Sequence, residues 1–145
     1  RIDPSASFKK EGARFAYHSD SPVSPYGPLH YITQGVTRLW QAPPQKVLGP
    51  EERVTVDDAI RAVTINAAYQ VMSEDKIGSL EVGKLADFVV LEKNPRQTPP
   101  EQIANIKVKE TWVGGKSCPP MFRGRQGAQL RSSFGAASVA AGHCG

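Results

Sequence analysis

Long hydrophobic runs are absent from this chain of 145 residues. No stretch approaches the roughly 18 apolar residues that a membrane-spanning helix needs. A secretory signal is also missing, because the N-terminus Arg1-Ile2-Asp3-Pro4-Ser5 is polar. There is no initiator methionine, which suggests a fragment or a processed chain. Together these absences predict a cytoplasmic protein that has no membrane as a partner.

Histidine and cysteine are scarce. The chain has three histidines, none of them in His-x-His spacing, and its two cysteines, Cys118 and Cys144, do not form a C-x-x-C motif. A tetrahedral zinc knuckle takes its ligands from closely spaced pairs of this kind. The cysteines therefore predict no zinc knuckle.

Acidic residues stop at Glu110. Four cations follow it and account for the whole net charge of +4: Lys116, Arg123, Arg125 and Arg131. A charge-balanced body with a basic tail differs from a nucleic-acid-binding surface, which needs cations clustered on a folded face. Residues 117–145 are also rich in Gly, Ala and Ser, a composition that cannot offset the entropy lost on ordering. We predict a disordered basic tail and no nucleic-acid partner.

The first half of the sequence predicts helices around one short strand. A helix is expected to close at Gly12, and a strand follows over residues 14–17. Pro28 suits the first turn of a second helix. The strongest helix starts after Thr55, where Thr55-Val56-Asp57-Asp58 has the form of a capping box. Apolar residues recur at helical spacing from there to Val71.

Strand periodicity replaces helical periodicity after Gly78. Residues 77–91 are typical of a tight β-hairpin, and the continuous apolar run Phe88–Leu91 predicts a return strand covered on both faces. Residues 106–112 alternate between apolar and polar, which predicts a half-buried strand ending in a turn at Gly114-Gly115. The prolines after Cys118 are expected to block a strand that returns from this turn.

Several segments carry a family resemblance. They are residues 15–23, which include His18-Ser19-Asp20, then Arg38, the helix start at residues 54–59, residues 64–68, and residues 78–91, which begin with the motif Gly-x-Leu-x-x-Gly-Lys-x-Ala-Asp. In this order they resemble the C-terminal end of a metal-dependent amidohydrolase, in the branch that contains N-substituted formamide deformylase. The resemblance implies an α/β fold: the last β/α unit of a TIM barrel over residues 1–76, and strands of a small composite β-domain over residues 77–116.

The resemblance also implies a chemistry, namely hydrolysis of carbon–nitrogen bonds other than peptide bonds in a small amide-like substrate. Asp20 would lie at a divalent metal, zinc by expectation, and would take a proton from the attacking water. His18 and Arg38 are weaker candidates for binding the substrate. The alternatives stay open: Asp20 as a loop or helix cap, His18 as a structural residue, and Arg38 as a surface or packing cation.

The chain also departs from the family pattern. A barrel needs about 250 residues and eight strands, whereas one barrel strand is expected here, and the family's His-x-His pair is absent. The isolated chain is therefore expected to be inactive. The other hypothesis is a non-catalytic interaction or structural protein derived from an amidohydrolase remnant. The identity of the substrate, the identity and number of metals, and the choice between monomer and homo-oligomer stay open.

Overall fold

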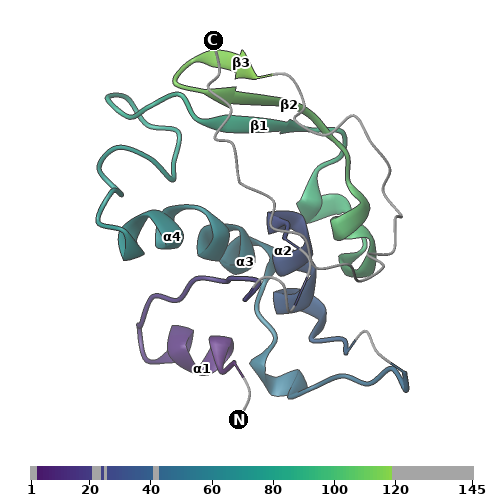
Figure 1. The fold of residues 1–145 in the computed structure, drawn as a ribbon. Coiled ribbons are helices and arrows are strands. Elements are labelled where there is room, and N and C mark those ends of the chain that lie inside the picture. The colour runs from purple at the N-terminus through teal and green to yellow at the C-terminus, as the bar shows by residue number, and fades with distance from the viewer. Residues whose placement is uncertain (1–2, 21–23, 25, 41–42, 119–145) are drawn as a thin grey trace, which may run out of the picture.

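The computed structural model describes residues 3–20, 24, 26–40 and 43–118 (Figure 1). The helices are α1 (Ser5–Lys10), α2 (Pro28–Thr37), α3 (Val56–Val63) and α4 (Ile65–Gln70). The strands are β1 (Phe88–Leu91), β2 (Val108–Val113) and β3 (Lys116–Cys118). Short 3-10 helices occupy Pro50–Glu52 (η1), Pro95–Gln97 (η2) and Pro100–Asn105 (η3). None of the helices in this part of the chain has the length and apolar character required to span a bilayer.

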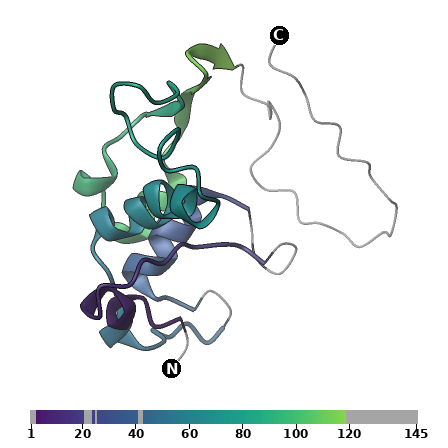
Figure 2. The same cartoon turned by 90° about the vertical axis from the view of Figure 1, so that its left-hand side faces the viewer.

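The elements form layers along one axis of the molecule. The antiparallel sheet lies at one end, α1 lies at the other, and α2, α3 and α4 lie between them (Figures 1 and 2). Helix α2 packs mainly against η3 and α3, which brings the segment before the sheet onto the helical layer. The observed class is therefore a mixture of helices and a small antiparallel sheet.

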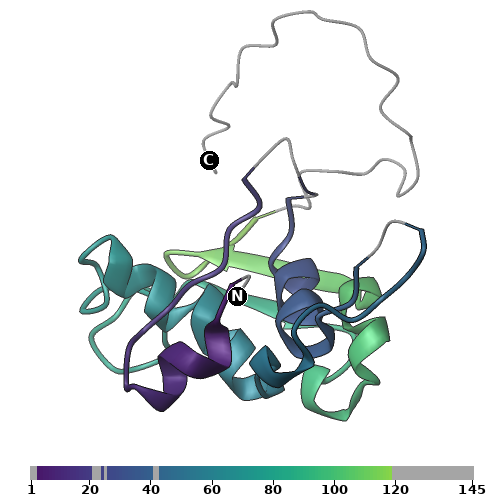
Figure 3. The same ribbon diagram turned by 90° about the horizontal axis from the view of Figure 1, so that it is seen from below.

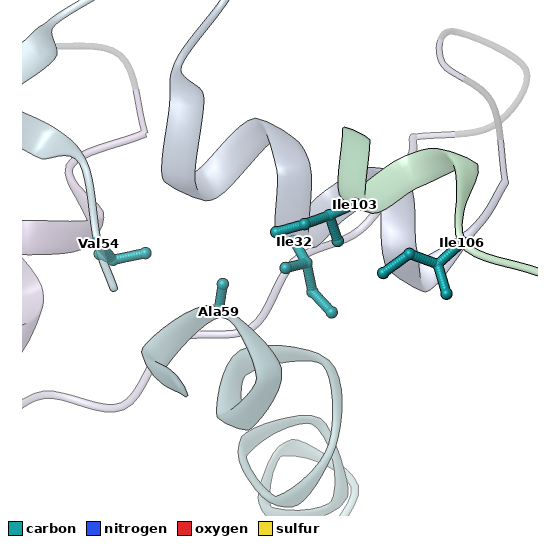
Figure 4. Close-up of a cluster of buried hydrophobic side chains, with 5 residues drawn as sticks. All are labelled: Ile32, Val54, Ala59, Ile103 and Ile106. Carbon is teal, nitrogen blue, oxygen red and sulfur yellow. The ribbon is translucent and has the colours of Figure 1, made fainter. Parts of the chain in front are cut away.

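The hydrophobic core sits where α2, α3 and η3 meet (Figure 4). Its buried members are Ile32, Val54, Ala59, Ile103 and Ile106. Ile103 has no exposed surface and is the largest side chain of the described residues to be buried so completely. Apolar residues at helical spacing on α2 and α3 thus fold into amphipathic helices because their faces can meet here.

The capping box that the sequence predicts at α3 is present. The Asp58 backbone N–H donates to Thr55 Oγ1 at 3.2 Å, and the Thr55 N–H donates to Asp58 Oδ2 at 3.3 Å. The helix ends at Val63, because the next residue, Thr64, has a φ of −124° and a ψ of −99°, which are not helical. The continuous helix expected through Val71 is therefore wrong, and α4 is a separate helix. The Thr64 hydroxyl donates to the Ile60 carbonyl at 2.7 Å, a local bond that often accompanies bends.

Removing the cap of α3 is expected to destabilise the fold measurably. The Thr55→Ala variant should lose about 1 kcal/mol of unfolding free energy, because the Asp58 N–H then has no side-chain acceptor. The Thr55→Ser variant keeps the hydroxyl and serves as the matched control. Urea denaturation followed by circular dichroism measures both variants, and equal losses in the two would contradict the capping assignment.

The strand expected over residues 14–17 is not formed. A strand exists only when a neighbour accepts and donates its backbone hydrogen bonds, and no described segment pairs with these residues. One backbone group is satisfied instead by a helix, because Asn66 Nδ2 donates to the Phe15 carbonyl at 2.9 Å. Residues 13–20 thus form a segment outside any described sheet, and it crosses the helical layer toward the N-terminal end of α2 (Figure 3).

The predicted hairpin over residues 77–91 is also wrong, because residues 77–80 form no strand. Strand β1 pairs instead with β2, with Phe88 opposite Trp112 and their rings stacked at a centroid distance of 5.5 Å. The predicted cover on both faces of β1 is wrong too, since Val89 is 52% exposed. The apolar run was sufficient to predict the strand but not its surroundings.

The turn at Gly114-Gly115 is confirmed and joins β2 to β3. Contrary to expectation, the return strand β3 forms, although it covers only Lys116–Cys118. It pairs through Val113 opposite Lys116 and Thr111 opposite Cys118, and therefore reaches the last residue before the prolines. The rest of the predicted tail, residues 119–145, lies outside the described residues.

Gly78 marks the point where the helical part passes into the strand part. A Cβ atom at this position would lie 2.8 Å from the Cβ of Ala68 and 2.9 Å from the Cα of Ile65. The backbone also has a φ of +90°, which side-chain-bearing residues rarely adopt. Both the space and the conformation therefore require glycine here.

Candidate functional site

A cleft of about 740 Å³ opens between the segment 13–20, the N-terminal residues and α2. Its lining includes Asp20, His18 and Arg38, the three residues singled out from the sequence. These residues come from positions up to 20 apart in the chain, and the fold brings them to one concave surface. A concave site with few convergent polar groups is the usual form of a small-molecule site.

Close contact between Tyr17 and α2 forms the floor of this cleft. A Cβ atom on Gly35 would lie 2.6 Å from the Tyr17 hydroxyl oxygen, so only glycine permits this approach. The Tyr17 hydroxyl donates to Ser5 Oγ at 3.1 Å, which ties the segment to α1. Burial raises the pKa of Tyr17, and the hydrogen bond with Ser5 opposes this only in part. The Tyr17 side chain is thus an uncharged and firmly held part of the cleft floor.

Asp20 ends the segment in an exposed position. Its backbone has a φ of +50°, in the left-handed region that Asp tolerates better than most residues. Within the described part of the chain, its carboxylate makes no hydrogen bond or ion pair. The capping role considered as an alternative therefore has no support among these residues, and the carboxylate is available to a ligand or a solvent molecule in the cleft.

His18 supports the turn that presents Asp20. The Asp20 backbone N–H donates to His18 Nδ1 at 3.1 Å. Because Nδ1 acts as an acceptor, the neutral ring carries its proton on Nε2. The imidazole thus accepts the backbone N–H of Asp20 and retains its own Nε2–H as a donor. This arrangement combines the structural role and the pocket-lining role that the sequence left open.

Arg38 follows α2 directly and has a left-handed backbone, with a φ of +57°. Its Nε donates to the Leu48 carbonyl at 3.0 Å, and its Nη1 donates to the Asp3 carbonyl at 3.2 Å. These bonds fasten the N-terminal residues and the loop at residues 46–48 to the end of α2. They favour a packing role, while substrate binding by Arg38 stays a prediction.

The side chains of the cleft include few metal ligands. Across the described residues, no group of three or more His, Cys, Asp or Glu side chains is arranged to hold a metal ion. The carboxylate of Asp20 and the imidazole of His18 are suitable ligand types for zinc. They are too few for a complete site, so the residues present fit a metal only as part of a larger ligand set.

Sequence reasoning missed several further residues in the lining. His30, Tyr31, Gln34 and Trp40 also face the cleft. The first three share the face of α2 that carries Gly35 and leads to Arg38, so helical spacing counted back from Arg38 would have identified them. The Tyr31 hydroxyl is buried and has no hydrogen-bond partner among the described residues. Helical spacing does not predict the position of Trp40, because this residue lies after the end of α2.

Comparisons with known proteins agree on one family. A model of the amidohydrolase family matches residues 1–118. Protein LONG AFTER FAR-RED 3 of Arabidopsis thaliana is 39% identical over 110 residues, which is 74% of this chain and 18% of that protein. N-substituted formamide deformylase of Arthrobacter pascens is 32% identical over 115 residues, or 79% of this chain and 21% of the enzyme.

A solved structure gives the same result. An amidohydrolase from Thermotoga maritima has a TM-score of 0.56 and 28% identity, and the match covers 81% of this chain and 25% of that one. The chain therefore spans between about a fifth and a quarter of the length of these relatives. Because the family model matches most of the sequence, the chain belongs to the amidohydrolase family.

Proposed function

We propose that this chain is the C-terminal part of a metal-dependent hydrolase that cleaves carbon–nitrogen bonds other than peptide bonds. The observation that carries the proposal is the cleft, in which Asp20 has an unengaged carboxylate beside His18. By motif, Asp20 corresponds to the aspartate that the family places at the end of a strand. The formamide deformylase among the relatives supports a small amide-like substrate by its name. A cytoplasmic location, with no membrane or nucleic acid as a partner, completes the proposal.

Asp20 acts as the proton carrier in this proposal. Its carboxylate accepts a proton from the attacking water and delivers it to the leaving nitrogen. A bound divalent metal, zinc by preference, would lower the pKa of that water to near neutrality. His18 keeps the Asp20 backbone in place and offers its Nε2–H to the substrate, and Arg38 fixes the end of α2 at the rim.

The architecture proposed for the whole protein is a TIM barrel with a small β-domain. Residues 1–76 would supply the last β/α unit, with Asp20 at the carboxyl ends of the strands, where such barrels have their active sites. Residues 77–116 would supply strands of the β-domain, and residues 117–145 a basic tail. The unpaired backbone of residues 14–17 and the exposed valines of β1 support this, since both lack neighbours that a complete protein would supply.

The isolated chain is expected to show no metal-dependent hydrolysis. Asp20 and His18 supply at most two ligands, and catalytic zinc sites use three protein ligands plus a water. Turnover of N-substituted formamides is measured with the purified chain, with and without added zinc, and the Asp20→Asn variant is the matched control. Zinc-dependent turnover that the wild-type chain shows and the variant lacks would contradict the expectation.

A non-catalytic interaction protein is the second candidate, favoured by the exposed apolar surface of the sheet. Val89, Val108 and Val113 are each about half exposed, at 52%, 48% and 50%. Exposed apolar side chains in neighbouring strands are common at contact surfaces with other chains. The coding sequence upstream of Arg1 separates the two candidates: continuation into a His-x-His strand supports the hydrolase, and a start codon immediately before Arg1 supports the interaction protein.

A further inference from the structure

A second hollow lies at the other end of the segment that carries Asp20. It has a volume of about 220 Å³ and is bounded by the end of α1, the start of this segment, α3 and α4. Three cations contribute to its wall, Lys9, Arg14 and Arg61, against one carboxylate, Asp58. The hollow has no role in the proposed hydrolysis, and every residue that forms it belongs to this chain.

Arg14 is held in a defined orientation at this hollow. Its guanidinium carbon lies 4.2 Å from the centre of the Tyr69 ring, in a cation–π contact. A stacked guanidinium keeps the N–H groups at its edge available, and their fork geometry matches two oxygens of one phosphate. Stacking therefore reduces the entropy that the side chain would lose on binding an anion.

The carboxylate of the hollow, Asp58, already has a cationic partner. Lys9 Nζ donates to Asp58 Oδ2 at 2.7 Å, and the Thr55 hydroxyl donates to the same oxygen at 2.5 Å. Partial burial raises the pKa of Asp58, but the hydrogen bonds from Lys9 and Thr55 outweigh it and lower the pKa below its ordinary value. Asp58 thus stays ionised and paired with Lys9 at neutral pH, and it leaves the positive charge of the arginines uncompensated.

Neither arginine has an acidic partner among the described residues. The nearby acidic residue on α3, Asp57, accepts instead from Arg96 Nε of η2. Arg61 and Arg14 are both exposed and line the same small hollow from α3 and from the segment 13–20. Because the Asp58 carboxylate of this hollow pairs with Lys9, the two arginines on the same concave surface attract a multivalent anion, which relieves their mutual repulsion.

We propose that the Arg14–Arg61 hollow binds a phosphate group, with Arg14 as the planar bidentate donor and Arg61 as the second cation. The site lies apart from the cleft at Asp20, and Phe15 is the residue that lines both. A phosphate bound there would link α1, α3 and the segment that presents Asp20.

Titration with inorganic phosphate tests the site on the full 145-residue chain. Backbone amide shifts of Gly12 and Ala13 and the side-chain amide of Asn66 are followed by ¹H–¹⁵N NMR, at an ionic strength held constant with sodium chloride. We expect saturable shifts with half-saturation below about 10 mM, an affinity within reach of a few charge-assisted contacts. Linear shifts, or equal shifts with chloride alone, would show an unspecific charge effect and overturn the proposal.

Three variants of the site and one control variant sharpen the test. Arg14→Gln and Arg61→Gln should each weaken phosphate binding about fivefold or more. Arg14→Lys should also weaken it, because the charge remains but the planar fork is lost. Lys10→Gln removes an exposed cation of α1 that does not line the hollow, and it should bind as the wild type does within about twofold. Equal binding by all four variants would overturn the site, and the same spectra report whether each variant is folded.

Discussion

The Ile103→Ala variant is expected to lose about 2–5 kcal/mol of unfolding free energy, the range for truncating a fully buried aliphatic side chain. Ile103 has no exposed surface and lies on η3, beside Ile32 of α2, in the core cluster that also contains Ala59 of α3 (Figure 4). The core of the described residues is small, so few neighbours can move to fill the cavity. Since total stabilities of domains are typically about 5–15 kcal/mol, this one change should leave a measurable unfolded fraction.

Val89→Ala is the matched control for Ile103→Ala. Val89 is an apolar residue that is 52% exposed on β1, so its truncation should cost about 0.5 kcal/mol or less. Chemical denaturation monitored by tryptophan fluorescence gives both values from the same protocol. A loss at Val89 equal to that at Ile103 would mean that the core has been placed wrongly.

The Asp20→Asn variant of a complete amidohydrolase carrying this sequence is expected to lower kcat by about 10²- to 10⁴-fold. The amide keeps the size of the carboxylate but cannot accept the proton of the attacking water, and general acid–base catalysis contributes about this factor. The effect should fall on kcat more than on KM, because the proton moves in the transition state. Steady-state kinetics on the small amide-like substrate class of the proposed function measures both constants.

Asp75→Asn is the control for that experiment. Asp75 is exposed, lies outside the cleft lining, and undergoes the same change of side chain. Its kcat should stay within about twofold of the wild type. If Asp20→Asn behaved like Asp75→Asn, the carboxylate would have no part in the proton transfer, and the assignment of Asp20 would fail.

Local signals predicted local structure well in this chain. The capping box at Thr55 and Asp58, the proline at the start of α2 and the turn at Gly114-Gly115 are all confirmed. Each of these features depends on residues that are a few positions apart. The interactions that stabilise them are therefore local and need no long-range contact. The same holds for β1, where a run of apolar residues was enough to predict a strand.

Predictions that depended on distant partners failed. The strand at residues 14–17 needed neighbours that the described chain does not supply, and β1 pairs with β2 rather than with residues 77–80. Sequence periodicity does not specify which strand pairs with which, because pairing depends on the whole topology. The contact of Tyr17 with Gly35 was hidden for the same reason.

The candidate site was predicted in part. Motif resemblance located Asp20 and His18, and the fold brings both to one cleft with Arg38. The carbonyl bonds of Arg38 could not be foreseen, because they depend on where Leu48 and Asp3 arrive in space. Helical spacing groups the cleft-lining residues of α2 on one face of the helix. The sequence does not specify that this face is the one that turns toward residues 13–20.

The lack of a side chain at Gly78 has a consequence for how this sequence can vary. At Gly78 the chain that leads to the sheet packs so closely against α4 that only a hydrogen atom fits as the side chain. Even the methyl group of alanine would clash with α4. Substitution at this position is therefore tolerated only if Ala68 or Ile65 shifts at the same time.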